Sequence, residues 1–365
     1  MPKGRMFRGG GMLRQLLRFC GQFEPFPAPG ALAKQDRRTR VFVMESKLVT
    51  VFGGSGFVGR HTVRALAKAG WRIRVAVLYP NQAFFLRPAG TVGQIAPLKC
   101  DVTDPEQVAA AVAGSEAVVN LTGILVPRGQ SFADVHADGA RNIAEAAARA
   151  GASALVHVSA IGADSESASH YAQSKAEGEA RLRAAFPAAT ILRPSIIFGP
   201  EDNFFNRFAG LARFVPALPL VGGGKTRFQP VFVGDVAAAI AAALTSEAAR
   251  GKTYELGGPM TYSFKELMQI VLRETGRRRA LVPVPFGIAL FKSFFLQMMP
   301  SPLLTPDQVR LLRRDNVVSP TALTLADLGI TPNSVEAEVP SYLWRFRAKG
   351  EYADLGRGLS ASTTE

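Results

Sequence analysis

The stretch HYAQSKAEGE, residues 170–179, holds a tyrosine and a lysine four residues apart in a segment with helical character. Residues at this spacing share one face of a helix, so Tyr171 and Lys175 are expected to face the same cleft. General acid-base work near neutral pH requires the pKa of a phenol to fall by about three units, or about 4 kcal/mol. An ammonium about 4 Å away contributes energy on that order at intermediate dielectric. The two residues are therefore a candidate proton-transfer pair.

A third residue with useful chemistry lies upstream of this pair. Ser159 precedes Tyr171 by twelve residues, a separation that lets the hydroxyl and the phenol converge on one substrate oxygen. Capping of a strand end is the alternative role for Ser159, and chance placement is the alternative for the pair. We predict Ser159, Tyr171 and Lys175 as the candidate catalytic residues.

The sequence VFGGSGFVGRH contains a glycine-rich loop of spacing G-x-x-G-x-x-G between an apolar run and a helical segment. Glycine lets the backbone turn sharply and approach a pyrophosphate, while the following helix N-terminus donates N–H groups to the anion. This context favours a dinucleotide-binding loop over a plain turn. The expected cofactor contacts in this loop are Gly53, Ser55, Gly56, Phe57, Val58, Gly59 and Arg60.

The end of the second expected strand indicates which dinucleotide would bind. An acidic residue there would hold the ribose hydroxyls of NAD, and an arginine would hold the 2′-phosphate of NADP. The residues present, LYPN at 78–81, supply neither. Arg60 and Arg87 are candidates for a 2′-phosphate contact, with a solvated surface charge as the alternative for each. The pattern favours NADP(H), with NAD(H) as the alternative, and Lys175 is also a candidate ligand of the nicotinamide ribose.

Short apolar runs alternate with helical segments from residue 48 onward. Strands are expected at 48–52, 72–77, 94–100, 116–121, 154–159 and 189–195. Helices are expected at 60–70, 104–114, 133–150 and 170–185, with Asp104 capping the second and Pro105 at its first position. Strands separated by such helices imply right-handed crossovers. The predicted fold class is α/β, a Rossmann-like doubly wound parallel sheet with a smaller C-terminal lobe.

Beyond residue 199 the pattern is less regular and richer in proline and aromatic residues. Helices are expected at 203–214, 234–244 and 263–275, and a strand at 228–233. The predicted organisation is a basic, disordered extension at 1–43, a NAD(P)-binding Rossmann domain at 44–260 with parts of the lobe inserted after about 199, a C-terminal lobe at 261–350 and a disordered tail at 351–365.

Several motifs together resemble those of the short-chain dehydrogenase/reductase superfamily, in its extended, atypical branch. They are the glycine loop, CDVTD after the third strand, NLTG after the fourth, Ser159 and Y-x-x-x-K. The resemblance covers about residues 48–258 and implies that Asp101 and Val102 bracket the adenine, with residues 120–123 supporting the sheet beside the cofactor. Leu121, Thr122, Gly123 and Pro194 are accordingly expected among the cofactor contacts.

A longer resemblance runs from about residue 48 to 347. The segment LRPSIIFGPEDNFFNRFAGLARFVPALPLVGGGKTRFQPVFVGDVAAAI and the later PSYLWRFR resemble the NADPH-binding accessory subunits of respiratory complex I and their bacterial relatives. This resemblance implies a tightly held dinucleotide with a structural or sensing role near the membrane arm and the quinone site. The expected partners are the dinucleotide and, by resemblance, respiratory-complex subunits, quinone or a membrane surface.

One helix departs from the superfamily pattern. In DVHADGARNIAEAAARAG, His136 stands in register with an asparagine that, in the superfamily, helps hold a water relay to the lysine. Its absence argues against sustained turnover. We interpret His136 as a satisfied structural residue, with a replacement acid as the alternative.

The formal net charge of +14 is unevenly distributed. Residues 1–43 carry nine Lys/Arg against one Glu and one Asp, so half of the excess lies in this segment and no nucleic-acid partner is expected. The alternatives for the segment are an organelle transit peptide or an extension before a true start at Met44. Cys20 and Cys100 are too few and too far apart for a disulfide framework, which favours a reducing compartment. The expected localisation is cytoplasmic, with a peripheral site on the inner face of the inner membrane, or the matrix side in a mitochondrion, as the alternative.

No metal site is expected, because His61, His157 and His170 have no partners at metal-ligand spacing. No apolar run is long enough for a membrane span; FGIALFKSFFLQMM, at 286–299, is interpreted as a core or interfacial helix. The many phenylalanines after residue 199 form either the core of the lobe or a surface for lipid, quinone or a membrane-bound partner.

The sequence leaves two functions open. One is a nucleotide-holding protein with little or no turnover, and the other is an active oxidoreductase or epimerase on an apolar or isoprenoid-type carbonyl or alcohol.

Overall fold

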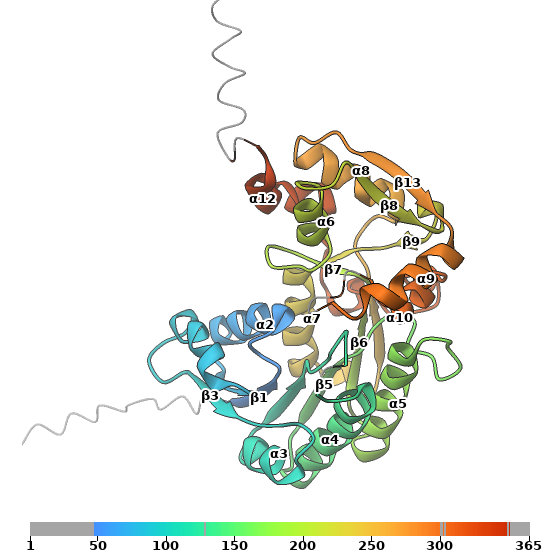
Figure 1. Ribbon diagram of the computed structural model, residues 1–365. Helices are drawn as coiled ribbons and strands as arrows, with labels where there is room; N and C mark the ends of the chain where they lie inside the picture. The colour runs from blue at the N-terminus through green and yellow to red at the C-terminus, as the bar shows by residue number, and fades with distance from the viewer. Residues whose placement is uncertain (1–46, 128, 300–301, 303, 349, 351–365) are drawn as a thin grey trace, which may run out of the picture. The chain divides into compact units, whose positions relative to one another are not determined.

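The computed structural model describes residues 47–127, 129–299, 302, 304–348 and 350 (Figure 1). The expectations for the N-terminal extension, for Cys20 and for the tail at 351–365 lie outside the described residues.

A seven-stranded sheet, parallel throughout, forms the centre of the fold, in the order β11-β6-β5-β4-β1-β2-β3. Its strands are β1 (Leu48–Phe52), β2 (Arg72–Val77), β3 (Ile95–Lys99), β4 (Ala117–Asn120), β5 (Ala154–Val158), β6 (Thr190–Pro194) and β11 (Thr253–Leu256). The chain winds outward in opposite directions from β1 and β4, so the topological switch point lies between these two strands. The doubly wound parallel sheet predicted from the sequence is confirmed.

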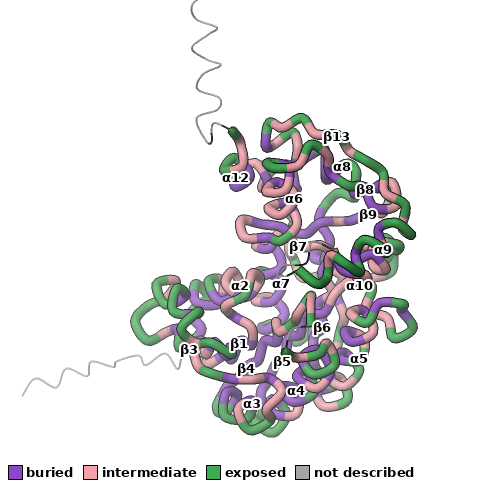
Figure 2. The backbone as a smooth tube through the Cα atoms, viewed as in Figure 1, coloured by how far each residue is buried: buried purple, intermediate pink, exposed green. Residues whose placement is uncertain are grey.

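Helices cover both faces of this sheet (Figure 1). One face packs against α2 (Phe57–Lys68) and α7 (Val233–Thr245), and the other against α3 (Pro105–Val112), α4 (Gly139–Arg149) and α5 (His170–Ala185). The residues of the central strands β1, β4 and β5 are almost all buried, which explains their continuous apolar runs, whereas the edge strand β3 is partly exposed (Figure 2). As predicted, Asp104 caps α3, where its carboxylate accepts hydrogen bonds from two backbone amides, and Pro105 opens the helix.

The connections contain short helical turns that the periodicity did not predict. They are η1 (Pro80–Ala89), η3 (Gly222–Gly224), η4 (Glu247–Ala249), η5 (Ala326–Leu328) and η6 (Trp344–Phe346). The helix expected at 133–150 begins as a π-helical turn, η2 (Ala133–Asp138), before α4. A π turn widens the backbone spiral, and such turns are frequent at functional sites.

A second core holds the C-terminal lobe together and is rich in phenylalanine. Its elements are α6 (Phe205–Leu211), β8 (Ala217–Val221), β12 (Tyr262–Ser263), α8 (Phe264–Glu274), β13 (Ala280–Val284), α11 (Val335–Glu338) and α12 (Pro340–Leu343). Phe205, Phe228 and Phe264 are buried in this core, and Phe204 and Phe208 pack against it. The interpretation of the aromatic residues as a lobe core therefore holds for this group.

Two expectations for this region need correction. The strand expected at 228–233 is split into β9 (Arg227–Phe228) and β10 (Val231–Phe232), which pair with β12 and with β7 (Ile197–Phe198) respectively. Pro230 breaks the run because a proline cannot donate a ladder hydrogen bond. The segment expected as a core or interfacial helix forms α9 (Phe286–Leu296), but only Ala289 and Ser293 are buried in it, which excludes a core helix.

Candidate functional site

The glycine loop lies at the switch point, between the end of β1 and the start of α2. Gly53 has a φ of +74°, and a Cβ on it would lie 3.1 Å from the backbone of Leu121. A Cβ on Gly59 would lie 2.4 Å from the carbonyl oxygen of Gly53, so this helix packs directly against the loop. α2 begins at Phe57, directly after the loop, and has no acidic residue in its first turn. The free amides at its N-terminus can therefore bind an anion held by the loop. The loop therefore fits the pyrophosphate of a dinucleotide.

Arg60 lies along the outside of the same loop. Its guanidinium contacts the carbonyl oxygens of Gly56 and Ser55, at 3.4 and 3.5 Å, and lies 5.0 Å from the ring centre of Phe85 in η1. Glu201, from the segment after β7, lies 3.5 Å from the Arg60 guanidinium. The positive charge of Arg60 is thus held at the rim of the glycine loop and is partly balanced by the Glu201 carboxylate. Arg87 instead stacks on Phe84, 4.3 Å from the ring centre.

The residues expected near the adenine come directly after β3. The Asp101 carboxylate accepts hydrogen bonds from the Thr103 amide and from the side-chain amide of Gln130, both at 3.0 Å. Val102 is buried, and its carbonyl oxygen accepts a hydrogen bond from Asn142. The structure brings Asp101 and Val102 to the same edge of the sheet as the glycine loop, and their contact with adenine stays a prediction.

The segment after β4 connects the glycine loop to the candidate catalytic residues. Leu121 donates its amide to Phe52 of β1 at 3.0 Å, which holds residues 121–123 beside the loop. A Cβ on Gly123 would lie 3.3 Å from the Lys175 ammonium, so glycine leaves the space that the lysine occupies. Pro194 ends β6, and its carbonyl accepts a hydrogen bond from Ile161 after β5.

Tyr171 and Lys175 lie on one face of α5, as their spacing predicts. The Lys175 ammonium lies 6.0 Å from the Tyr171 ring centre and donates a long hydrogen bond of 3.4 Å to the Val158 carbonyl. Burial raises the pKa of the Tyr171 phenol to about 12. Burial also lowers the pKa of Lys175 to about 8, despite the opposing Glu179 carboxylate. In the protein alone, burial therefore opposes the lowering of the phenol pKa that spacing suggests.

His136 is fully engaged in the structure. Its Nε2 accepts a hydrogen bond from the Ile124 amide at 3.0 Å, so the proton of the neutral ring lies on Nδ1. Nδ1 lies 2.8 Å from the Ser174 hydroxyl, which itself donates to the Tyr171 carbonyl. Burial, with the nearby Lys175 ammonium, lowers the pKa of His136 to about 3. Both ring nitrogens are used and the ring is neutral, which supports the interpretation of His136 as a structural residue.

Close packing fixes His136 against the helix of the candidate catalytic pair. The imidazole and the Tyr171 ring meet edge to face, with ring centres 5.5 Å apart. A Cβ on Gly178 of α5 would lie 2.1 Å from the His136 carbonyl oxygen. The backbones of α5 and η2 therefore touch, and glycine at this position permits the contact.

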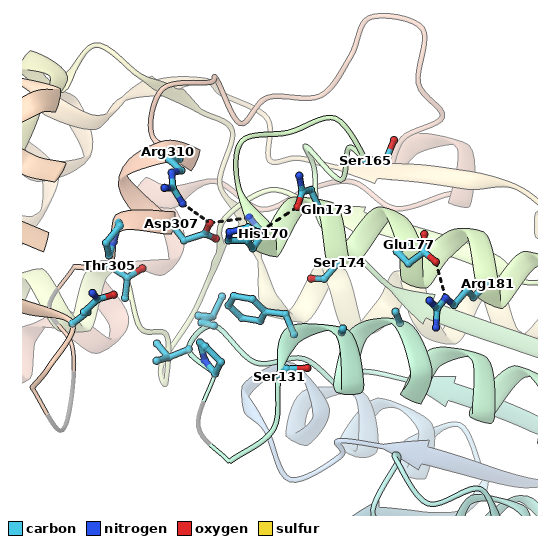
Figure 3. A pocket seen from close by; sticks show the side chains of 18 residues that line it. Ser131, Ser165, His170, Gln173, Ser174, Glu177, Arg181, Thr305, Asp307 and Arg310 are labelled. Carbon is cyan, nitrogen blue, oxygen red and sulfur yellow. Dashed lines mark hydrogen bonds and ion pairs between the residues drawn. The ribbon is translucent and has the colours of Figure 1, made fainter. Parts of the chain in front are cut away.

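Asp307 is a site residue that no sequence signal predicted. It lies on α10 (Pro306–Leu311), and its carboxylate accepts hydrogen bonds from the Ser169 hydroxyl and the amides of His170 and Tyr171, at 2.8, 2.8 and 3.2 Å. Figure 3 shows Asp307 between His170 and Arg310. The carboxylate thus caps α5 from a distant part of the chain. No local pattern signals a contact between residues 136 positions apart.

A pocket of about 1000 Å³ lies beside this cap, between α5, α10 and the segment after β4 (Figure 3). None of the predicted catalytic or cofactor residues lines it. Across the described ranges, no group of three or more His, Cys, Asp or Glu side chains is placed to hold a metal ion. Within the same ranges, no helix is long and apolar enough to cross a membrane.

Comparisons with known proteins agree with this geometry. Residues 49–257 match the NAD dependent epimerase/dehydratase family. The mitochondrial NADH dehydrogenase [ubiquinone] 1 alpha subcomplex subunit 9 of Arabidopsis thaliana is 36% identical over 83% of this chain and 79% of its own length. A ceramide reductase of Caulobacter vibrioides is 37% identical over 53% of this chain and 60% of its own length.

Among solved structures, an NADPH-dependent quinone oxidoreductase of Escherichia coli has the same fold. It aligns with a TM-score of 0.66 over 81% of this chain and 99% of its own, at 20% identity. The resemblance to the complex I accessory subunits is confirmed by the identity to the plant subunit. The chain belongs to the NAD-dependent epimerase/dehydratase family of extended short-chain dehydrogenases/reductases, and membership implies that it binds a dinucleotide.

Proposed function

We propose that this protein holds NADP(H) as a structural or sensing element and is associated with respiratory or ubiquinone function, with little turnover of the nucleotide. The observation that carries the proposal is the complete glycine loop, whose backbone contacts at Gly53 and Gly59 fit a dinucleotide. The loop can hold a nucleotide, whereas in the protein without nucleotide burial raises the pKa of the Tyr171 phenol to about 12, away from the range that proton transfer near neutral pH requires. Identity to complex I subunits supports the same role.

The preference for NADP(H) rests on Arg60. Its guanidinium lies at the rim of the glycine loop, and no carboxylate follows β2. In the Arg60→Gln variant we expect the Kd for NADPH to rise about tenfold or more, because a phosphate contact is lost, while the Kd for NADH changes less than about twofold. Arg72→Gln, at the opposite end of β2, is the matched control. Equal weakening of both nucleotides would refute the assignment of Arg60.

Association with a respiratory assembly is supported by an exposed apolar face on α9 and its C-terminal extension. Ile288, Phe291, Phe294, Phe295 and Met298 are 50–80% exposed and recur at helical spacing on one side. Monomeric soluble proteins rarely expose a continuous apolar patch of this kind unless it meets a partner. We propose that this face contacts an apolar surface of a respiratory complex.

The test is affinity purification of the full chain from membranes of its native host, followed by identification of the bound proteins. We expect subunits of NADH:ubiquinone oxidoreductase with the wild type and a loss of at least about tenfold with Phe291→Ser/Phe295→Ser. The Phe214→Ser variant is the control, because Phe214 is 81% exposed but lies outside α9. Recovery of lipid alone, or of no respiratory subunit, would overturn this assignment.

A second candidate function is an NADP-dependent oxidoreductase or epimerase on an apolar or isoprenoid-type carbonyl or alcohol. It is favoured by the buried Ser159 hydroxyl, which has no hydrogen-bond partner in the protein, and by the partial identity to a ceramide reductase. In it Ser159 would orient the substrate oxygen, Tyr171 would transfer the proton and Lys175 would stabilise the phenolate. Incubation of the copurified nucleotide with lipid extracts decides between the two functions. Redox turnover that stops in Tyr171→Phe would overturn the structural role.

A further inference from the structure

Three buried polar side chains beneath α5 have atoms without a hydrogen-bond partner. They are the Nδ2 of Asn120, both ring nitrogens of His157 and the hydroxyl of Ser159, and the three residues are 1%, 2% and 4% exposed. A buried polar group left unpaired costs about 1–3 kcal/mol. Among the described residues, no other buried side-chain nitrogen or oxygen lacks a hydrogen-bond partner. All of the unpaired buried atoms therefore belong to these three residues.

These side chains share one face of the sheet. The register of β4 and β5 places Asn120 directly beside His157. Side chains alternate along a strand, and Val118 and Leu155, two residues earlier on each strand, pack in the core beneath α3, α4 and α5. Asn120 and His157 therefore point toward the helices, and Ser159 follows on the same side.

Lys175 completes this group from the helix above. Its ammonium is 5% exposed and makes one long hydrogen bond, to the Val158 carbonyl of β5 at 3.4 Å. The remaining two N–H donors of the ammonium have no protein acceptor among the described hydrogen bonds. The titratable groups that face His157 are the Lys175 ammonium on α5 and the neutral imidazole of His136 on η2. Burial, with the Lys175 charge, lowers the pKa of His157 well below its usual value.

The donor and acceptor inventory of this group identifies what is missing. Asn120 offers two N–H donors, Lys175 offers two further donors, the neutral imidazole of His157 offers one acceptor and one donor, and the Ser159 hydroxyl offers one donor and two acceptors. The donors exceed the acceptors, so direct pairing cannot satisfy the group. One water molecule can accept from Asn120 and Lys175 and donate to the free ring nitrogen of His157, whereas a cation is excluded by the lysine.

We propose that Asn120 and His157 hold a buried water against the Lys175 ammonium, and that His157 is a positioning residue that stabilises the charged form of this lysine. The water gives the ammonium an acceptor in a region where burial otherwise favours its neutral form. The inference concerns the protein without nucleotide and requires no turnover, so it stands or fails independently of the proposed function.

The pKa of Lys175 in the nucleotide-free full chain tests this inference directly. Lysine labelled with 13C at Cε gives a resonance that is assigned by its loss in Lys175→Arg, and its shift is followed against pH. In His157→Leu, a volume-matched variant without an acceptor, we expect the proton affinity of Lys175 to fall about tenfold or more. In His157→Gln, whose amide oxygen accepts a hydrogen bond, we expect most of the affinity to be restored.

The control is Leu155→Ala, which disturbs the same buried strand face without touching a polar group. It lowers the stability of the fold and is expected to leave the Lys175 titration unchanged. A folded His157→Leu protein with the wild-type titration would overturn the inference. A crystal structure gives a second test that does not depend on folding of the variant: a water bonded to both His157 and Asn120 is expected, and a dry contact between the two side chains would equally overturn it.

Discussion

Removal of the Asp307 carboxylate is expected to loosen the first turn of the helix that carries Tyr171 and Lys175. The carboxylate is 16% exposed and accepts three hydrogen bonds from Ser169, His170 and Tyr171. A hydrogen bond to a charged group contributes about 1.5–3 kcal/mol, but the two amides regain water in the variant. Loss of a helix cap costs about 0.5–2 kcal/mol. We therefore expect Asp307→Ala to lower the free energy of unfolding by about 2–3 kcal/mol.

Asp307→Asn removes the charge and keeps only part of the hydrogen bonding. The His170 and Tyr171 amides donate to different carboxylate oxygens, so the single amide oxygen of asparagine can keep one of these two bonds, and the expected loss is about 1–2 kcal/mol. Chemical denaturation measures both variants, and hydrogen exchange at the amides of residues 170–171 reports the local opening. Glu247→Ala is the control, because it removes the same charge from a side chain that is 84% exposed. The reasoning is refuted if Asp307→Ala and Glu247→Ala are equally stable and exchange equally.

Three further predictions concern the loop, the helix contact and the buried lysine. Gly59→Ala is expected to weaken NADPH binding at least about tenfold, because its Cβ would press on the Gly53 carbonyl. Gly287→Ala is the control and should leave binding unchanged, because the space around the added Cβ is open. Isothermal titration calorimetry measures both variants. Gly178→Ala is expected to cost about 3 kcal/mol or more in urea unfolding because its Cβ would overlap the His136 carbonyl oxygen, and a loss below about 0.5 kcal/mol would contradict the contact. Because burial lowers the pKa of Lys175 to about 8, the unfolded chain binds more protons than the native state between this pH and the unfolded pKa near 10.5. The stability of the nucleotide-free wild type relative to Lys175→Met should therefore rise with pH by up to about 1.4 kcal/mol per unit across that window, and a flat difference would contradict the burial.

The sequence predicted the elements whose signals are local. Apolar runs that alternate with helical periodicity indicated the strands and helices of the parallel sheet, because strands buried on both faces are apolar throughout. Asp104 and Pro105 marked the start of α3, because a cap formed by the residue directly before a helix depends on neighbouring residues alone. The glycine spacing located the loop between β1 and α2, because only glycine fits where two backbones touch.

The exposure of α9 was not predictable from its composition. Phe291, Phe294 and Phe295 have the side chains of a core helix, and the sequence left both a core and an interfacial position open. Which face of a helix is covered depends on the elements that pack against it, and here only Ala289 and Ser293 are buried. The exposed aromatic face is therefore a property of the assembled lobe.

The sequence by itself determined the fold class, the dinucleotide loop and the shared helix face of Tyr171 and Lys175, since each depends on residue type and short-range spacing. The tertiary structure alone decided the pKa values and the hydrogen-bond partners of the side chains around Tyr171 and Lys175. Burial raises the pKa of the phenol, Ile124 and Ser174 fix the neutral imidazole of His136, and Asp307 caps their helix. Desolvation and contacts between distant segments exist only after the chain has folded, so no local pattern encodes them.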